Sequence, residues 1–290
     1  MRSLLFVPGD SEAKLAKSLD AGADALIVDL EDSVEPERKA RARETAVSFL
    51  AEHDRGKTVY VRVNDLRSGL ADGDLDAVMA QAPNGVMLPK AEGRVDLDLL
   101  AAKLRVREAR FGLIDGRTKI IALITETPAA VLAGASFGRG AERLAGLTWG
   151  AEDLSAALGA LQTRDEAGQM TDVFRLARSV TLLAAAAAET AAIDTVFTDF
   201  RDADGLRAEC LAAVRDGFLG KLAVHPAQVP VINAAFTPSP EAVAEAQAIV
   251  DAFRRNEGQG VTSLGGRMLD RPHLKRAERL LARADGLGGD

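Results

Sequence analysis

Two acidic residues follow apolar runs that are separated by about one helix length of chain. The first run, residues 120–124, leads to Glu126, and the second, residues 144–149, leads to Asp153. If each run is a buried parallel strand, both carboxylates lie at the sheet edge where ligands bind. Oxygen ligands without a nearby Cys or His favour a hard cation, so the pair predicts a Mg²⁺ site, with Mn²⁺ as a substitute. The alternative for Asp153 is a helix N-cap, because residues 154–161 have a helical pattern.

Two basic residues also stand within or directly after apolar runs. Arg62 alternates with valines, so its side chain faces one side of its strand, and a charge that faces a sheet interior needs an acid or an anionic ligand. We predict that Arg62 contacts an anionic ligand; the alternative is a structural salt bridge to Glu31 or Asp32. Lys90, at the end of another run, has the same two interpretations.

The elements that must position these side chains follow a regular pattern. Eight short apolar runs alternate with helical patterns at roughly even spacing. This alternation predicts an α/β fold, a (β/α)₈ TIM barrel, whose catalytic residues lie at the carboxyl ends of the strands. An open doubly wound sheet is the alternative, but no glycine-rich nucleotide fingerprint follows the first run. The predicted strands cover residues 3–7, 25–30, 58–63, 85–88, 120–124, 144–149, 193–198 and 221–224.

The barrel is predicted to close within residues 1–236, which leaves residues 237–290 as a C-terminal helical extension. Helical patterns there cover residues 241–256 and about 271–284, with a glycine-rich turn between them. The extension is too short for an independent core, so we expect it to pack on the barrel or on a neighbouring subunit. Within the barrel, a further helix is predicted from residue 129 to about residue 144.

Composition narrows the class of protein. The 290 residues carry a net charge of −7, which argues against a nucleic-acid partner, and any polyanionic ligand must meet a local basic patch. The single cysteine, Cys210, precludes an internal disulfide and indicates a reducing compartment. No window approaches the length of a membrane helix, and the first apolar run is too short for a signal peptide, so we expect a cytoplasmic protein. His225 is predicted to be packed or hydrogen-bonded rather than catalytic.

Eight short motifs resemble those of the citrate lyase beta-subunit-like CoA-ester lyases, in the same order and spacing and over essentially the whole chain. They are RSLLFVPG from residue 2, DLEDSV from residue 29, VRVN from residue 61, LPK from residue 88, ETP from residue 126, GAEDL from residue 150, VHPAQ from residue 224 and GRMLDRP from residue 266.

The resemblance implies a TIM barrel, trimeric or hexameric, that binds Mg²⁺ through Glu126 and Asp153. It implies that Arg62 contacts the 2-keto acid or its precursor. It also implies that Asp270 enters a neighbouring subunit's active site as the acid/base; the alternative, a helix N-cap, is compatible with that role. The presence of this acid favours a stand-alone enzyme similar to malyl-CoA or citramalyl-CoA lyases over a citrate lyase beta subunit that needs an acyl-carrier protein.

The resulting hypothesis is a reversible retro-Claisen cleavage of a 3-hydroxy-3-carboxy acyl-CoA to acetyl-CoA or propionyl-CoA and a 2-keto acid. Mg²⁺ polarises the substrate's hydroxyl and carboxylate oxygens, and Arg62 places positive charge beside the developing oxyanion. Asp270 transfers the proton at the thioester's α-carbon. Arg2 and Lys90 are the candidates to bind the phosphates of CoA. The alternatives are thioester hydrolysis on the same scaffold and a metal aldolase that does not use CoA.

Overall fold

The computed structural model describes residues 1–52, 56–138, 141–256 and 260–286. Its contacts divide the chain into two compact units, Met1–Asn233 and Ala234–Asp290. Helix α9 (Val229–Phe236) runs through the division, and the domain boundary that we predicted after residue 236 stays a prediction.

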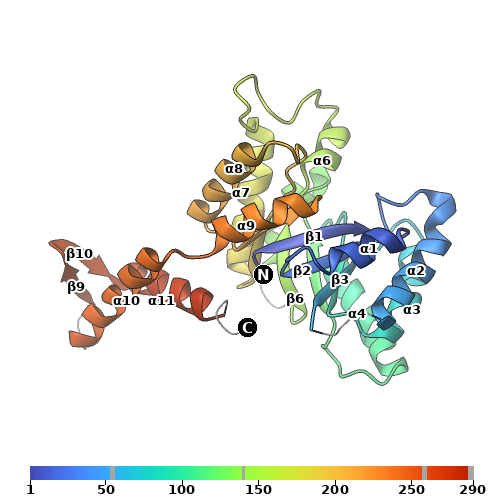
Figure 1. Cartoon of the computed structure of the whole chain (residues 1–290), viewed down its shortest axis with the longest axis horizontal. Coiled ribbons are helices and arrows are strands. Elements are labelled where there is room, and N and C mark those ends of the chain that lie inside the picture. The colour runs from blue at the N-terminus through green and yellow to red at the C-terminus, as the bar shows by residue number, and fades with distance from the viewer. Residues whose placement is uncertain (53–55, 139–140, 257–259, 287–290) are drawn as a thin grey trace. The chain divides into compact units, whose positions relative to one another are not determined.

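The first unit is a closed barrel of eight parallel strands in which each strand pairs with the next and β8 pairs with β1 (Figure 1). This arrangement confirms the predicted (β/α)₈ TIM barrel. The strands are β1 (Ser3–Pro8), β2 (Ala25–Asp29), β3 (Thr58–Arg62), β4 (Gly85–Leu88), β5 (Lys119–Leu123), β6 (Leu144–Thr148), β7 (Ala191–Asp194) and β8 (Gly220–Ala223).

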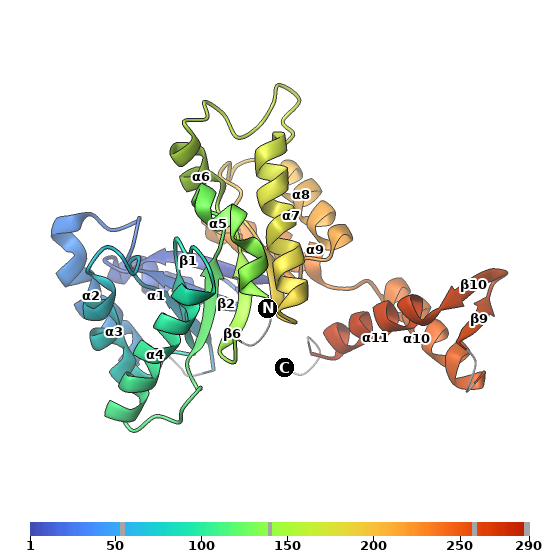
Figure 2. The same cartoon turned by 180° about the vertical axis from the view of Figure 1, so that it is seen from behind.

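Helices of this unit lie outside the strands, as seen from behind in Figure 2. The helices between consecutive strands return the chain from the carboxyl end of one strand to the amino end of the next, which parallel pairing requires, and α9 follows the last strand. With α9 they are α1 (Glu12–Ser18), α2 (Lys39–Glu52), α3 (Ala71–Val78), α4 (Arg94–Arg110), α5 (Pro128–Leu132), α6 (Ala151–Leu158), α7 (Asp172–Ala187) and α8 (Ala203–Asp216), and the 3₁₀ turns are η1 (Pro36–Arg38), η2 (Met79–Gln81), η3 (Gly134–Phe137) and η4 (Pro226–Gln228).

Alternate strand residues fill the interior of the barrel. Ile27 of β2 and Tyr60 of β3 belong to one buried cluster with residues of the other strands. Because side chains of a strand alternate between its two faces, the next inward positions toward the carboxyl end are Asp29 and Arg62. The apolar interior therefore ends in charged residues at the mouth of the barrel.

Two predicted elements differ from the structure. The helix predicted from residue 129 to about residue 144 is only the short α5, followed by η3, where Gly134 packs so closely on Val180 that a Cβ would lie 2.2 Å from that side chain. The strand predicted at residues 193–198 is shorter and begins earlier, because its ladder with β8 ends at the pair Asp194–Lys221. Asp199 therefore follows a loop rather than a strand.

The second unit contains two packed helices and a small hairpin. Helices α10 (Pro240–Arg255) and α11 (Arg271–Asp285) bury Ala246, Val250 and Ala277 between them. Strands β9 (Val261–Leu264) and β10 (Arg267–Asp270) pair antiparallel. The two helices were predicted from the sequence but the hairpin was not, although two consecutive glycines between short apolar segments are the usual signal of a hairpin. Both glycines of this turn, at positions 265 and 266, have positive φ.

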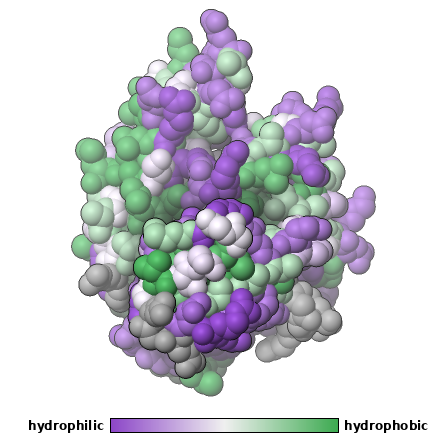
Figure 3. All heavy atoms as spheres, turned by 90° about the vertical axis from the view of Figure 1, so that its left-hand side faces the viewer, coloured by the Kyte–Doolittle hydropathy of each residue, from purple (hydrophilic) through white to green (hydrophobic). Residues whose placement is uncertain are grey.

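Hydrophilic and hydrophobic residues are interspersed on the face shown in Figure 3. In the described part of the chain, no helix has both the length and the apolar character needed to cross a membrane.

One buried ion pair joins the last two strands of the barrel to the helix between them. Lys221 is completely buried, and its Nζ lies 3.1 Å from Asp194 Oδ2 and 2.7 Å from Glu209 Oε1. Burial lowers the pKa of Lys221, but the two carboxylates outweigh it and hold the pKa above its ordinary value. The indole Nε1 of Trp149 donates to Asp194 Oδ1 at 2.8 Å, which also fixes the chain just after β6.

We expect Lys221→Met to lower the free energy of unfolding by roughly 3 kcal/mol, because the change removes the nearer cation of the buried Asp194 carboxylate and leaves only Arg178, at 3.5 Å, of the two described ion-pair partners. Unfolding in urea, followed by circular dichroism, measures the loss. Lys119→Met is the matched control, since Lys119 is exposed and donates to the Gly116 carbonyl; it should cost at most about 0.5 kcal/mol. A similar cost for the two variants would contradict the role of the ion pair.

Candidate metal and substrate site

Charged side chains from five strands meet at the carboxyl end of the barrel. Glu31 follows β2, Arg62 ends β3, Lys90 follows β4, and Glu126 and Asp153 follow β5 and β6. The structure therefore brings together four of the residues predicted for the site, Arg62, Lys90, Glu126 and Asp153. Each strand delivers its residue to the same rim, as parallel pairing requires.

Arg62 is held by an acid that the sequence analysis did not single out. Its Nε donates to Asp29 Oδ1 at 2.7 Å and its Nη2 to Asp29 Oδ2 at 2.6 Å. Its Nη1 lies 3.1 Å from Glu31 Oε2 and 3.8 Å from Asp32 Oδ2, so the salt bridge weighed as an alternative is present. The Phe6 ring lies beneath the guanidinium, 4.7 Å away.

Asp29 was detectable in the sequence as the inward residue at the end of an alternating strand. In the register of the barrel it lies directly opposite Arg62. Burial raises the pKa of the Asp29 carboxyl, but the guanidinium of Arg62 outweighs burial and holds that pKa below its ordinary value. Asp29 also accepts from the backbone N–H groups of Glu31 and Ser33. One carboxylate therefore fixes both the arginine and the loop that carries Glu31.

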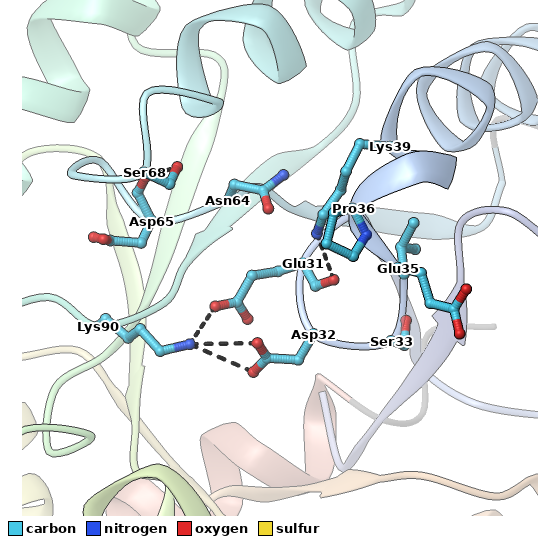
Figure 4. Close-up of a pocket in the computed structure, with 11 residues that line it drawn as sticks. Glu31, Asp32, Ser33, Glu35, Pro36, Lys39, Asn64, Asp65, Ser68 and Lys90 are labelled. Atoms are coloured by element: carbon cyan, nitrogen blue, oxygen red, sulfur yellow. Dashed lines mark hydrogen bonds and ion pairs between the residues drawn. The ribbon is translucent and has the colours of Figure 1, made fainter. Parts of the chain in front are cut away.

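Lys90 bridges the acids of the site. Its Nζ donates to Glu31, and lies 3.4 Å from Asp32 Oδ1 and 3.2 Å from Asp153 Oδ1. Its backbone N–H donates to Glu126 Oε2 at 2.5 Å, with φ at +52°, a left-handed conformation that is uncommon for a residue other than glycine. Figure 4 shows the carboxylates of Glu31 and Asp32 turned toward this ammonium group.

Glu126 is almost fully buried. Burial, together with the nearby carboxylates of Asp153 and Glu31, raises its pKa to about 8 against the opposing N–H and ammonium groups of Lys90. Burial likewise raises the pKa of Glu31 to about 7. The chain leaves no room between β6 and this carboxylate, because a Cβ at Gly150 would lie 2.9 Å from Glu126 Cγ. Glu126 is thus packed in place while its charge is poorly compensated.

The donor set fits a hard divalent cation. Five carboxylates share the three nearby cations Arg62, Lys90 and Lys39, and Glu31 Oε2 is buried without an aligned hydrogen-bond donor among the described residues. Within residues 1–52, 56–138, 141–256 and 260–286 no three His, Cys, Asp or Glu side chains form a ready-made metal cage. Mg²⁺ usually binds one or two carboxylates and keeps its other positions for water and substrate oxygens. Glu126 and Asp153 are the pair that would hold such an ion.

A pocket of about 740 Å³ opens beside this rim. Its walls include Glu31 and Asp32, Asn64 and Lys90, and Lys39 (Figure 4). The Nζ of Lys39 donates to the backbone carbonyls of residues 30 and 31, which holds the acidic loop against the pocket. The pocket can admit a small polar ligand next to the side chains that the metal would engage.

Two other predicted site residues, Arg2 and Asp270, belong to other parts of the chain. Arg2 precedes β1, at the amino end of the barrel, and its Nη2 lies 2.7 Å from Asp24 Oδ1. The structure therefore does not bring Arg2 to the rim, because the rim is formed by the opposite ends of the strands. Asp270 belongs to the second unit, where it caps α11.

Asp270 forms a pair that the sequence analysis missed. Its carboxylate contacts Nδ1 of His273, and the two residues form a reciprocal capping box at the start of α11. The hydrogen bond from His273 holds the pKa of the Asp270 carboxyl below its ordinary value. The sequence signal for this pair was the capping-box pattern, in which a capping acid is followed three residues later by a side chain that can hydrogen-bond to the cap's backbone N–H.

The chain is a TIM-barrel protein with a candidate divalent-metal site. The carboxyl ends of its strands carry paired carboxylates, an arginine and a lysine. The chain belongs to the HpcH/HpaI aldolase/citrate lyase family, whose model matches residues 2–226. This confirms the resemblance from the sequence motifs. The helical extension lies beyond the matched range.

Three comparisons cover nearly the whole chain. Rat mitochondrial citramalyl-CoA lyase is 32% identical over 303 residues, covering 99% of this chain and 86% of that protein. The (3S)-malyl-CoA thioesterase of Cereibacter sphaeroides is also 32% identical, covering 99% and 95%. The structure of CitE from Mycobacterium tuberculosis in complex with magnesium, acetoacetate and coenzyme A superposes with a TM-score of 0.79 at 35% identity and covers 98% of each chain.

Proposed function

We propose that this chain is a Mg²⁺-dependent carbon–carbon lyase of CoA esters. Its substrate is a 3-hydroxy-3-carboxy acyl-CoA of the malyl-CoA or citramalyl-CoA type, and its products are acetyl-CoA or propionyl-CoA and a 2-keto acid. The observation that carries the proposal is the pair Glu126 and Asp153 beside Arg62 at the barrel mouth. A related chain has a complex with magnesium, acetoacetate and coenzyme A.

Bound Mg²⁺ supplies Lewis acidity at oxygens of the substrate. Glu126 and Asp153 would hold that ion. Arg62 lies at the same rim, with its guanidinium fixed by Asp29 and linked to Lys90 through Glu31. We assign Arg62 the carboxylate of the keto acid and the charge that develops on the adjacent oxygen, because a fixed cation stabilises that charge without reorganising. Lys90 lies 3.2 Å from Asp153 and orients its carboxylate.

Cleavage breaks the bond between the hydroxyl-bearing carbon and the α-carbon of the thioester, while the hydroxyl loses its proton to water and its oxygen becomes the keto oxygen. The electron pair of that bond becomes the enolate of acetyl-CoA or propionyl-CoA. We assign protonation of the α-carbon to Asp270, whose short side chain stands at the exposed start of α11. In the condensation direction the same carboxylate removes that proton, since one group serves both directions of a reversible step.

The quaternary structure and cellular location belong to the same proposal. We infer a homotrimer or hexamer in which the extension, residues 237–290, serves as an active-site element, and a cytoplasmic location. A single buried free cysteine, Cys210, supports a reducing compartment. Sedimentation analysis tests the oligomer directly.

The alternative function is hydrolysis of the thioester, because one relative of equal identity is a (3S)-malyl-CoA thioesterase. The purified protein, incubated with Mg²⁺ and malyl-CoA or citramalyl-CoA, distinguishes the two. We expect the 2-keto acid to appear in equal amount to acyl-CoA, with no free thiol. Free thiol without keto acid would establish the thioesterase instead. Neither product from the folded protein would favour a citrate lyase beta subunit that needs an acyl-carrier partner.

A further inference from the structure

The nucleotide end of CoA has no binding residues among those considered so far. Arg2 lies at the amino end of the barrel, and Lys90 is engaged with acids of the metal site. The barrel mouth near β2 to β6 is strongly acidic, so it repels the phosphates of CoA. The question is which part of the same rim can hold an adenine nucleotide.

We propose that Phe200 and His225 form a stacking platform for the adenine of the CoA thioester, with Arg201 beside it for a phosphate. The inference rests on the proposed function, because it takes the CoA ester as substrate. Phe200 follows β7 and His225 follows β8, so both lie at the carboxyl end of the barrel, the same end as Glu126 and Asp153.

The two rings are already arranged as a stack. Their centroids are 4.7 Å apart and their planes differ by 21°. The guanidinium carbon of Arg201 lies 5.6 Å from the centroid of the Phe200 ring. Aromatic rings and an arginine are the groups on which proteins stack nucleobases without reading their sequence, and the arginine's charge suits a phosphate.

The platform is exposed where an aromatic residue would otherwise be buried. Phe200 is 46% exposed, and it is the only aromatic residue among the exposed large apolar side chains in the described ranges of the chain. By contrast Phe174 and Phe218, on neighbouring elements of the same unit, are buried. His225 is also exposed. An exposed flat apolar surface beside a cation is the form that a purine site takes.

A buried glutamine builds the site from two separate loops. Gln228 is 1% exposed, and its Oε1 accepts from the backbone N–H groups of Val224 and His225 at 2.9 and 3.2 Å. Its Nε2 donates to the carbonyl of Phe197 at 2.7 Å, in the loop that carries Phe200. The Nδ1 of His225 accepts from the N–H of residue 227 at 3.2 Å, which fixes the ring. The stack is thus held by the chain rather than formed by chance contact.

The decisive comparison uses two forms of one substrate, citramalyl-CoA and citramalyl-pantetheine, which lacks the nucleotide. Phe200→Ala is expected to raise KM for the CoA ester about tenfold with kcat unchanged, which corresponds to about 1.4 kcal/mol. For the pantetheine ester KM should stay the same. Phe200→Trp should keep the KM of the natural chain, because it keeps a flat aromatic ring. Arg201→Gln should raise KM for the CoA ester by a smaller factor than Phe200→Ala does, and this KM should depend less on salt concentration.

Phe111→Ala is the matched control, because Phe111 also has an arginine over its ring, at 5.3 Å, but follows α4 at the amino end of the barrel. It should leave both KM values unchanged. Equal effects of Phe200→Ala on both esters would overturn the proposal, since the ring would then serve the acyl group or the fold. No effect on either ester would overturn it as well.

Calorimetry with free CoA and with AMP separates this proposal from the reaction. We expect CoA to bind the natural chain about tenfold more tightly than Phe200→Ala, whether or not the protein cleaves citramalyl-CoA. Loss of that difference overturns the platform even if the lyase activity is present. If AMP binds as tightly as CoA and also depends on Phe200, the site serves free nucleotides and its assignment to the substrate is overturned.

Discussion

Glu126→Gln is expected to remove Mg²⁺ binding and to lower kcat/KM for the CoA ester by at least about a hundredfold. The amide keeps the size of the side chain, so it preserves the tight packing on Gly150 and the fold. It removes the charge that would hold the ion. Titration calorimetry with Mg²⁺ and the keto-acid assay measure the two losses.

Glu152→Gln is the control for this variant. Glu152 lies beside Asp153 in the first turn of α6, but it is exposed. The change removes the same charge without touching the proposed metal pair, so it should alter Mg²⁺ affinity less than about threefold through long-range attraction alone. Full Mg²⁺-dependent turnover by Glu126→Gln would contradict the metal assignment.

The pH dependence of stability gives Glu126 a second signature. Burial raises its pKa from an ordinary 4.5 to about 8, so the metal-free folded chain binds this proton more tightly than the unfolded chain. The free energy of unfolding should therefore fall as the pH rises between these values. Mg²⁺ should reverse the fall, and Glu126→Gln should show a shallower one. Calorimetric Tm values of the metal-free protein at about pH 5 and about pH 8 test this. A Tm that rises from the lower to the higher pH would contradict the raised pKa of Glu126.

Asp270→Asn is expected to lower kcat by about a hundredfold to ten-thousandfold, the usual contribution of a general acid or base. Asparagine caps helices as well as aspartate does, so α11 should keep its start and the chain its stability. Mg²⁺ affinity should not change, because the proposed metal pair lies on the barrel. Exchange of the α-protons of acetyl-CoA with deuterium in the presence of a keto acid isolates the proton-transfer step, and it should be lost.

Asp285→Asn, at the other end of the same helix, is the control and should remain active. A mixture of the Asp270→Asn and Glu126→Gln chains then tests whether one subunit supplies the acid to another. If the extension serves a neighbouring subunit, refolded mixtures should regain part of the activity that each variant lacks. Undiminished proton exchange in Asp270→Asn would contradict the assigned role.

The barrel was predictable because its signal is periodic and repeated. Eight short apolar runs alternate with helical patterns, and this pattern is typical of the (β/α)₈ barrel. The paired carboxylates could be placed at one rim for the same reason, since the end of a parallel strand has a defined location. Arg2 was misplaced because a motif fixes sequence order, whereas its side chain precedes its strand and binds Asp24 at the opposite end.

What the sequence could not provide is the partner of each charge. Arg62 had three acids within reach along the sequence, and only the register of β2 and β3 identifies Asp29 as the one directly opposite. The bond between His273 and Asp270 depends on the cap geometry of α11, which a spacing alone suggests but does not establish. The stack of Phe200 on His225 joins two loops whose lengths carry no periodic signal.

The guanidinium of Arg62 has consequences for the heat and entropy of substrate binding. A free arginine loses about 2 kcal/mol of rotamer entropy when a ligand immobilises it. In this chain Asp29 and the ring of Phe6 already immobilise it in the folded state. The ordering cost is therefore incurred once, during folding, and not in each catalytic cycle. A keto acid that binds here meets a cation with little conformational freedom left to lose, so its binding should carry a smaller unfavourable entropy than binding at a site built on a mobile lysine.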